Sequence, residues 1–164
     1  MPAIQPIDTS NRTEVDAFLR DHWHTTTMAV RGLLFDLSRT DGALVREEGE
    51  IVGLITWRAF GDALEILSLD SVRENLGVGT ALLGAAEARA RTGGLDRLLC
   101  ITTNDNLRAL GFYQKRGFIL KALYPNAVAA ARRLKPEIPL TSAEGIPIRD
   151  ELELEKKLEA APLP

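Results

Sequence analysis

The alternation of hydrophobic and polar residues changes its period several times along the chain, and each change marks an expected element. Residues 3–7 are expected to form a short strand at the edge of a sheet, because Pro2 and Pro6 cannot donate the backbone hydrogen bonds that a central strand needs. A helix is expected to begin at Asn11, whose spacing to Glu14 is a variant of the capping box. After three threonines, residues 28–38 are expected to form a loop or a short helix.

The middle of the chain predicts a hairpin, a further strand and a long helix. Residues 43–46 and 51–58 are β-rich runs around a Glu-Glu-Gly-Glu turn. A second turn at Gly61 leads into a strand over residues 64–72. Gly77 opens a helix whose apolar positions keep helical spacing until two consecutive glycines stop it.

The last part of the chain alternates strands and helices: a strand over 97–103, a helix over 107–116, a strand over 118–124, a helix from Pro125 to Leu134, a loop over 135–147 and a strand over 149–156. Strands first and then alternating helix and strand predict a mixed α/β fold with a sheet flanked by helices. The 164 residues are expected to form one domain, 1–164, with a helix–loop insertion at about 125–147 before the last strand.

Composition narrows the classes of function. Hydrophobic residues make up 45% of the chain and charged residues 26%, as in ordinary globular proteins. A net charge of −3 disfavours nucleic acid as a partner. The single cysteine, Cys100, is expected in the core and excludes an intrachain disulfide. Neither a signal peptide nor a membrane span is recognised, so we expect a cytoplasmic protein with no membrane partner.

The first candidate site lies at the expected start of the long helix and comprises Glu74, Asn75, Leu76, Gly77, Val78, Gly79 and Thr80. Its two glycines let the backbone approach a ligand, and the amides of the new helix favour an anion such as phosphate. The alternative is a tight turn in which the glycines serve packing. The segment has neither the ending of a P-loop nor the third glycine of a dinucleotide fingerprint.

The second candidate site follows one strand later, as Asn106, Ala109, Tyr113, Gly117 and Phe118. On a helix, Ala109 and Tyr113 are four residues apart and share a face, with Asn106 one turn earlier. The alternative interpretation is an asparagine helix cap, a small packing alanine and a core tyrosine.

Together the two segments resemble the GNAT family of N-acetyltransferases, which acetylate amines with acetyl-CoA. The family's loop Gln/Arg-x-x-Gly-x-Gly/Ala matches Gly77 and Gly79, and its motif Asn-x-x-Ala-x-x-x-Tyr followed by Gly-Phe is present in full. The resemblance covers roughly residues 3–124 and the last strand. It implies a central mixed, mostly antiparallel sheet flanked by helices.

The resemblance also implies a role for each matching residue. The backbone of Leu67 and Leu69 would pair with the pantetheine amides, and the Gly77 loop would hold the pyrophosphate. Asn106 would hydrogen-bond the cofactor arm, beside Ala109. Tyr113 would lie near the sulfur and give a proton to the leaving thiolate.

The loop departs from the family pattern at one position. Glu74 stands where the family has Gln or Arg, which places an anion beside a pyrophosphate. The loop can still bind through its amides if Glu74 points outward. Arg73 or Arg108 is a candidate for the missing positive charge.

The acceptor amine needs a base, because an alkyl amine with a pKa near 10 is mostly ammonium at pH 7. Glu65 is the first choice, since family members often use a carboxylate there, and strand alternation puts it on the face of Leu67 and Leu69. Asp70 is the second choice. The cluster His22, Trp23 and His24 is a candidate lining for the acceptor pocket, or else its histidines are surface residues. No third ligand is evident nearby, so no metal is expected.

We therefore expect an N-acetyltransferase that uses acetyl-CoA as co-substrate. A primary amine on a small molecule or peptide would attack the thioester directly in a ternary complex. The alternative is a non-catalytic acyl-CoA-binding or regulatory domain of the same fold. A nucleotide-binding module that uses only the glycine loop leaves the second motif unexplained. The family builds its acceptor pocket from segments that correspond to residues 23–36 and 125–148, although residues 125–147 are also a candidate contact of a homodimer.

Overall fold

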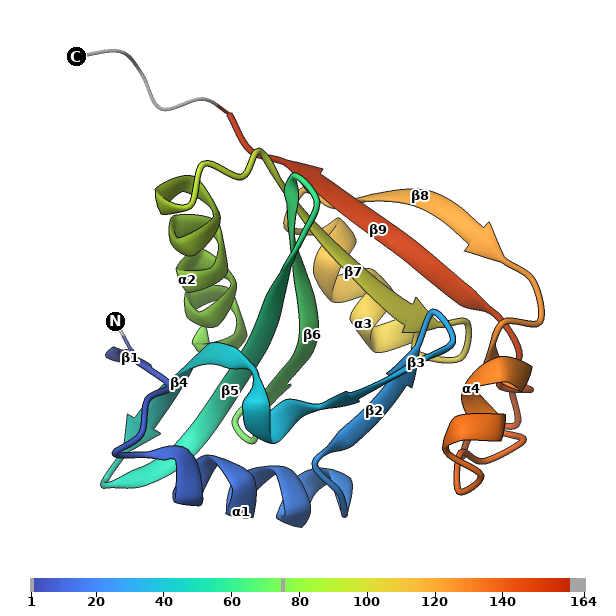
Figure 1. Cartoon of the computed structure of the whole chain (residues 1–164), viewed down its shortest axis with the longest axis horizontal. Coiled ribbons are helices and arrows are strands. Elements are labelled where there is room, and N and C mark those ends of the chain that lie inside the picture. The colour runs from blue at the N-terminus through green and yellow to red at the C-terminus, as the bar shows by residue number, and fades with distance from the viewer. Residues whose placement is uncertain (1, 75, 160–164) are drawn as a thin grey trace. The chain divides into compact units, whose positions relative to one another are not determined.

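The computed structural model describes residues 2–74 and 76–159. The contacts of the chain divide it into two compact units. The second unit consists of residues 27–35 and 99–157, and the first contains the other described residues. Each unit is therefore assembled from separate stretches of the sequence (Figure 1). The expectation of a single domain stays a prediction.

The first unit is a sheet of antiparallel strands with helices: β1 (Ile4–Pro6), α1 (Arg12–Trp23), the 3-10 helix η1 (Leu37–Arg39), β4 (Asp41–Glu47), β5 (Glu50–Phe60), β6 (Ala63–Ser71) and α2 (Val78–Thr92). Its strands follow the order β1-β4-β5-β6, with each neighbouring pair antiparallel. The two predicted hairpin turns are confirmed. Gly49 and Gly61 have left-handed φ angles of 86° and 60°, which tight hairpin turns require.

α2 packs directly on the middle of this sheet, and a glycine permits the close approach. A Cβ atom built on Gly53 of β5 would overlap Val78 Cγ1 and lie 3.0 Å from Leu82 Cδ1. The buried side of α2 continues along the helix as Leu83, Ala86 and Ala90. The start of α2 is therefore held against β5 by its own first residue, Val78.

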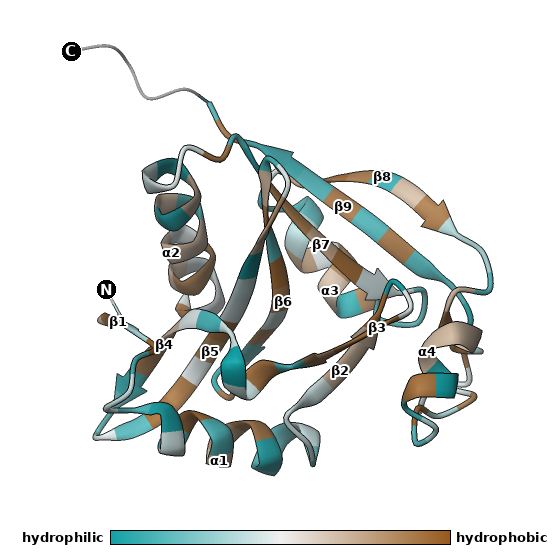
Figure 2. Ribbon diagram, in the orientation of Figure 1, coloured by the Kyte–Doolittle hydropathy of each residue, from teal (hydrophilic) through white to brown (hydrophobic). Residues whose placement is uncertain are grey.

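The second unit holds all or most of β2 (Thr27–Val30), β3 (Leu33–Asp36), β7 (Arg97–Thr103), α3 (Leu107–Gln114), β8 (Ile119–Tyr124), α4 (Val128–Leu134) and β9 (Glu151–Lys157). β2 pairs with β3, and β9 lies between β7 and β8. Figure 2 shows the alternation of apolar and polar residues along β9 that predicted this strand. The mixed α/β fold with mostly antiparallel strands and flanking helices is confirmed.

The expectation of a loop or short helix over residues 28–38 is wrong. These residues form the β2–β3 hairpin and then η1. The turn is made by Arg31 and Gly32, with φ angles of 55° and 70°. Two successive left-handed residues are the geometry that closes a two-residue hairpin, and the Arg-Gly pair is a weaker sequence signal for it than Asn-Gly or Asp-Gly.

Asn11 is the N-cap of α1, as expected, but one predicted capping interaction and one predicted helix start need correction. The capping box at the start of α1 does not form, because the Asn11 side chain accepts from Asp8 N and donates to Pro6 O. Glu14 instead forms an ion pair with Arg46 at 2.6 Å. α4 begins at Val128 rather than at Pro125, since Asn126 has a left-handed φ of 59° that a helix does not accommodate.

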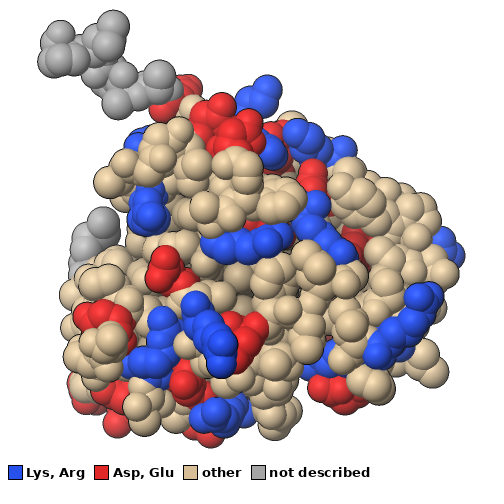
Figure 3. Space-filling view, in the orientation of Figure 1, with Lys and Arg blue, Asp and Glu red and all other residues tan. Residues whose placement is uncertain are grey.

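Charged side chains of both signs are interspersed on the face of the molecule drawn in Figure 3. No broad area of one charge is visible there, which agrees with the near balance of 20 basic and 23 acidic residues. None of the helices in the described part of the chain combines the length and the hydrophobicity needed to cross a bilayer.

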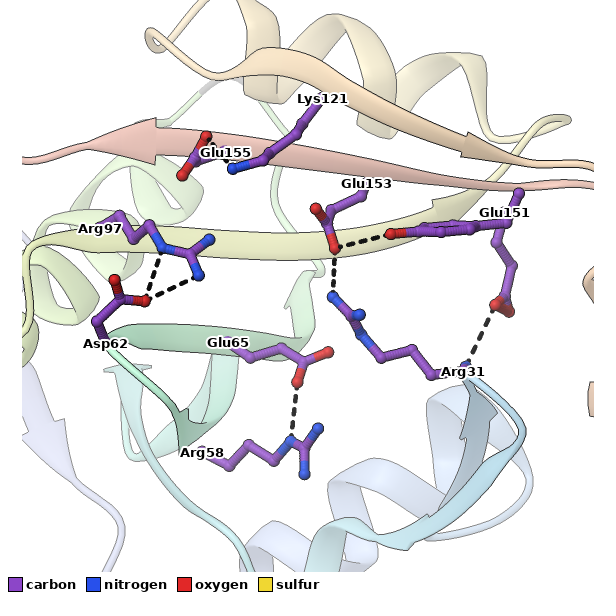
Figure 4. Close-up of polar contacts among 10 residues, drawn as sticks. Arg31, Arg58, Asp62, Glu65, Arg97, Lys121, Glu151, Glu153 and Glu155 are labelled. Atoms are coloured by element: carbon purple, nitrogen blue, oxygen red, sulfur yellow. Dashed lines mark hydrogen bonds and ion pairs between the residues drawn. The ribbon is translucent and has the colours of Figure 1, made fainter.

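β9 buries a row of carboxylates that the sequence did not predict to be buried. Glu151, Glu153 and Glu155 are 3%, 7% and 4% exposed. Figure 4 shows their partners: Lys121 Nζ lies 3.0 Å from Glu155, and Arg31 Nη2 lies 2.5 Å from Glu153. The backbone N–H of Arg31 donates to Glu151 at 3.2 Å. The two Arg31 contacts hold the turn of the β2–β3 hairpin against β9 within the second unit, and the Lys121 contact joins β8 to β9.

Candidate active site

The N-cap of α2 is a glycine, which has no side chain that could cap the helix. Gly77 is the N-cap, with a left-handed φ of 77° that costs other residues about 1–2 kcal/mol. The first intrahelical bond runs from Ala81 N to Gly77 O at 2.9 Å, so the amides of residues 78–80 precede the helical ladder. The first turn contains no acidic residue. With the helix dipole, this turn is suited to an anion.

The residues before this turn are solvent-exposed. Glu74 and Leu76 are exposed, so Glu74 does not occupy a buried position beside the amides. Arg73 Nε lies 3.1 Å from Glu47 Oε2, and that ion pair already occupies one candidate for the missing positive charge. Asn75 lies outside the described residues. The binding roles of this loop stay predictions.

A β-bulge in β6 changes which side chains share a face of the sheet. Thr56 lies opposite Ser68, but Trp57 lies opposite Ile66, so Leu67 is the extra residue. Beyond the bulge, Leu69 lies opposite Ile55, whereas Glu65 lies opposite Arg58. Residues that differ by three positions along a regular strand point to opposite faces. The expectation that Glu65 and Leu69 share a face is therefore wrong.

Glu65 is paired with a cation rather than surrounded only by leucines. Its side chain is 1% exposed, and Arg58 Nε donates to Oε2 at 2.8 Å. Figure 4 shows the two side chains pointing toward one another. Arg58 and Glu65 lie opposite each other in the hairpin, two residue pairs away from the pair that flanks the Gly61 turn. Once the turn is placed at Gly61, the register of the hairpin therefore predicts this contact. The role of Glu65 as a base stays a prediction.

Asp70 lies on the same face as Glu65 and Ser68, and it meets the end of α1. The indole N–H of Trp23 donates to Asp70 Oδ1 at 2.8 Å, while Oδ2 has no hydrogen-bond partner among the described residues. Burial raises the pKa of Asp70, and the Trp23 hydrogen bond and the charge of His22 act in the opposite direction. Sequence reasoning named all three residues without connecting them, because 47 positions separate Trp23 from Asp70.

The second motif lies on α3, in the second unit. Asn106 is the N-cap of α3, and its Oδ1 accepts from Ala109 N at 3.1 Å. Tyr113 is 7% exposed and its ring packs edge-on against Phe112 and Phe118, at 5.2 Å and 5.0 Å between centroids. The asparagine cap and the packed tyrosine of the alternative interpretation are therefore both present. The functional roles of these residues stay predictions.

Two histidines at the end of α1 and the single cysteine complete the set of candidate residues. His22 stacks on Phe18 at 4.0 Å between ring centroids, and His24 is exposed at the end of α1 with a left-handed φ of 61°. Cys100 is buried, as expected. Within the described residues, no group of three or more His, Cys, Asp or Glu side chains is arranged to hold a metal ion.

Comparison with known proteins places the chain in a family. Residues 9–118 match the model of the Acetyltransferase (GNAT) family. The uncharacterized protein YxbD of Bacillus subtilis (strain 168) is 49% identical over 146 residues, which cover 88% of this chain and 92% of that protein.

Solved structures with the same fold include a Bacillus subtilis acetyltransferase in complex with CoA (TM-score 0.70, 19% identity, 97% of this chain and 100% of that chain). The ribosomal-protein-S18-alanine N-acetyltransferase from Escherichia coli is also similar (TM-score 0.68, 13% identity, 99% of this chain and 97% of that chain). The family match spans more than half of the sequence and includes both motifs, so this protein belongs to the GNAT family of acetyltransferases.

Proposed function

We propose that the protein is an acetyl-CoA-dependent N-acetyltransferase that transfers an acetyl group to a primary amine by direct attack in a ternary complex. The observation that carries this proposal is the turn into α2, where Gly77 is a left-handed N-cap and the amides of residues 78–80 precede the helical ladder. Membership of the GNAT family supports acetyl-CoA as the anion that binds there.

The first unit supplies the proposed contacts with the cofactor. The amides of Gly77, Val78, Gly79 and Thr80 would bind the pyrophosphate, which requires only backbone donors and is compatible with an exposed Glu74. The backbone of β6 at Leu67 and Leu69 would pair with the pantetheine amides. The bulge supports this role, since it interrupts the regular ladder between β6 and β5 at Leu67, and bulges are frequent beside active sites.

The second unit supplies residues whose roles are carried over from the family motif. The amide nitrogen of Asn106 would donate to the cofactor arm, because its Oδ1 is already used to cap α3. Ala109 would keep the same helix face free of bulk. The phenol of Tyr113 would give its proton to the thiolate that leaves when the amine attacks the thioester.

The acceptor is proposed to be an amine of a small molecule or a peptide. The ribosomal-protein-S18-alanine N-acetyltransferase is an example of a similar fold whose name specifies a protein acceptor. Part of the candidate acceptor segment, residues 125–147, is tied together internally, since Arg132 donates to the carbonyls of Pro139 and Ile148 at 2.7 Å and 2.6 Å. A homodimer contact through this segment stays a prediction.

The runner-up is a non-catalytic acyl-CoA-binding domain, favoured by the Arg58–Glu65 ion pair that occupies the first-choice base. Two measurements separate the proposals. Acetyl-CoA should raise the melting temperature while ATP should not, and CoA thiol should be released on addition of at least one amine from a panel of diamines, amino sugars and peptides. Binding of acetyl-CoA without thiol release would support the runner-up, and stabilisation by ATP alone would contradict both.

A further inference from the structure

The two oxygens of the Asp70 carboxylate have different surroundings. Oδ1 accepts the Trp23 indole N–H at 2.8 Å. Oδ2 is shielded from solvent and has no hydrogen-bond partner among residues 2–74 and 76–159. This oxygen is an unsatisfied hydrogen-bond acceptor, and burial of an unpaired polar atom is energetically unfavourable. The N–H of a bound amine, or a water that bridges to it, would donate the missing hydrogen bond.

We propose that Asp70 is the general base that takes the proton from the ammonium group of the acceptor, and that Trp23 is a positioning residue for its carboxylate. This inference rests on the proposed acetyltransferase function and identifies the base within it. It assigns to Asp70 the role for which the sequence favours Glu65.

The surroundings of the two carboxylates decide between them. Glu65 is 1% exposed and is bound by the Arg58 guanidinium, which would have to release it before it could take a proton from an amine. Asp70 is less buried as a residue than Glu65, and its Oδ2, although shielded from solvent, has no hydrogen-bond partner in the described chain that would have to release it. The hydrogen bond from Trp23 reaches the other oxygen and so orients the group without occupying Oδ2.

The proton and electron balance of the step is complete with the groups named. An ammonium N–H bond breaks as an O–H bond forms at Asp70 Oδ2. The nitrogen lone pair then forms a bond to the acetyl carbon, the carbon–sulfur bond breaks, and the thiolate takes a proton from Tyr113. The acetylated nitrogen still carries one proton more than an amide and gives it up to water, from which Tyr113 is reprotonated, and Asp70 returns its own proton to solvent.

Several groups act on the charge of Asp70, and their signs suit a base. Burial raises the pKa of Asp70 above its ordinary value, which brings it toward the pH at which an amine must be deprotonated. The Trp23 N–H and His22, both from α1, lower that pKa in part. From β5, the residue opposite is the uncharged Leu54, and two charged residues further along that face, Arg58 and Glu65, pair with each other.

The test compares Asp70→Asn with Glu65→Gln on two acceptors, one alkyl amine that is mostly ammonium at the assay pH and one weakly basic amine that is mostly neutral. We expect Asp70→Asn to lower kcat for the alkyl amine by about 10²–10⁴-fold, with acetyl-CoA affinity unchanged. The loss should be much smaller for the weakly basic amine, which is already neutral and attacks without prior deprotonation. Equal losses on both amines, or a loss in Glu65→Gln alone, would overturn the assignment. A wild type inactive on every amine would overturn the proposed function itself.

A second arm tests Trp23 through the pH profile of kcat/KM. Trp23→Phe removes the hydrogen bond that lowers the pKa of Asp70, so the lower limb of the profile should move to higher pH. Trp57→Phe is the matched control, because its indole N–H is buried without a partner in the described chain and does not meet Asp70. A limb that stays in place in Trp23→Phe, or moves equally in the control, would refute the positioning role.

Discussion

Substitution of Gly53 by alanine tests how the sheet holds the proposed cofactor-binding turn in place. The added Cβ would overlap Val78 Cγ1 and would also lie 3.0 Å from Leu82 Cδ1 and 3.4 Å from the Asp70 carbonyl oxygen. Two of these atoms belong to the first two turns of α2. Since β5 is a central strand and the carbonyl belongs to its neighbour β6, we expect the helix to move rather than the sheet.

Overpacking of this kind costs about 1–3 kcal/mol, and 1 kcal/mol corresponds to roughly 2–4 °C in Tm for a chain of this size. We therefore expect Gly53→Ala to lower Tm by about 2–12 °C in thermal unfolding followed by circular dichroism. Because Val78 is the first residue of α2, the same displacement should weaken acetyl-CoA binding in calorimetry.

The chain offers a matched control and a rescue. A Cβ on Gly84, in the exposed middle of α2, meets nothing within 4 Å, so Gly84→Ala should raise stability by about 0.5–1 kcal/mol through helix propensity alone. Addition of Val78→Ala to Gly53→Ala removes the overlapped atom and should make the double variant more stable than the two single losses predict. Gly53→Ala that melts with the wild type, or strictly additive losses, would refute the packing argument.

The other predictions concern the site and the assembly. Gly79→Leu should greatly weaken acetyl-CoA binding in calorimetry while Gly84→Leu, on the exposed side of α2, should not; equal affinities would exclude the turn as the pyrophosphate site. Tyr113→Phe should lower kcat by about 10²–10⁴-fold with acetyl-CoA affinity kept, whereas Tyr124→Phe should be as fast as the wild type; an unchanged rate in pre-steady-state kinetics would leave Tyr113 a packing residue. The pKa of Asp70 is raised in the folded state, so the folded state binds this proton more tightly than the unfolded state, and stability falls as pH rises above 3.8. Asp70→Asn should therefore have a higher Tm than the wild type at neutral pH, and this difference should disappear below about pH 4. A difference in Tm that stays constant across pH would contradict the shift. If the 125–147 segment forms a homodimer, Leu140→Asp, at a side chain 73% exposed, should produce a monomer in sedimentation equilibrium, and an unchanged mass would exclude that contact.

Elements whose stability comes from nearby residues could be predicted from the sequence. The strand over 97–103 and the helix that follows Gly77 form within the expected bounds, because local periodicity and a single left-handed glycine are enough to define them. The β2–β3 hairpin was missed for the opposite reason. Its anchors are distant in sequence: Arg31 binds Glu153, and Lys135 Nζ donates to Thr27 O at 2.7 Å.

The two motifs of the site could also be recognised from the sequence, because each lies within one short segment of the chain. The glycines of the α2 turn and the Asn106-to-Phe118 segment each act within about a dozen residues, so spacing alone reveals them. The choice of base depends instead on strand register. One inserted residue at Leu67 reverses the face of every following side chain relative to Glu65. Alternation read from the sequence has no access to a bulge, which forms only when two strands pair.

The contact between Trp23 and Asp70 depends on how α1 docks on β6. Helical periodicity identifies the buried stripe of α1 as Val15, Phe18 and Leu19, and that stripe determines which side of the helix meets the sheet. It does not determine how far along the sheet the helix end reaches, because many positions bury the same apolar area. Packing of the whole first unit selects one of them, and only then does the indole N–H of Trp23 meet the carboxylate of Asp70.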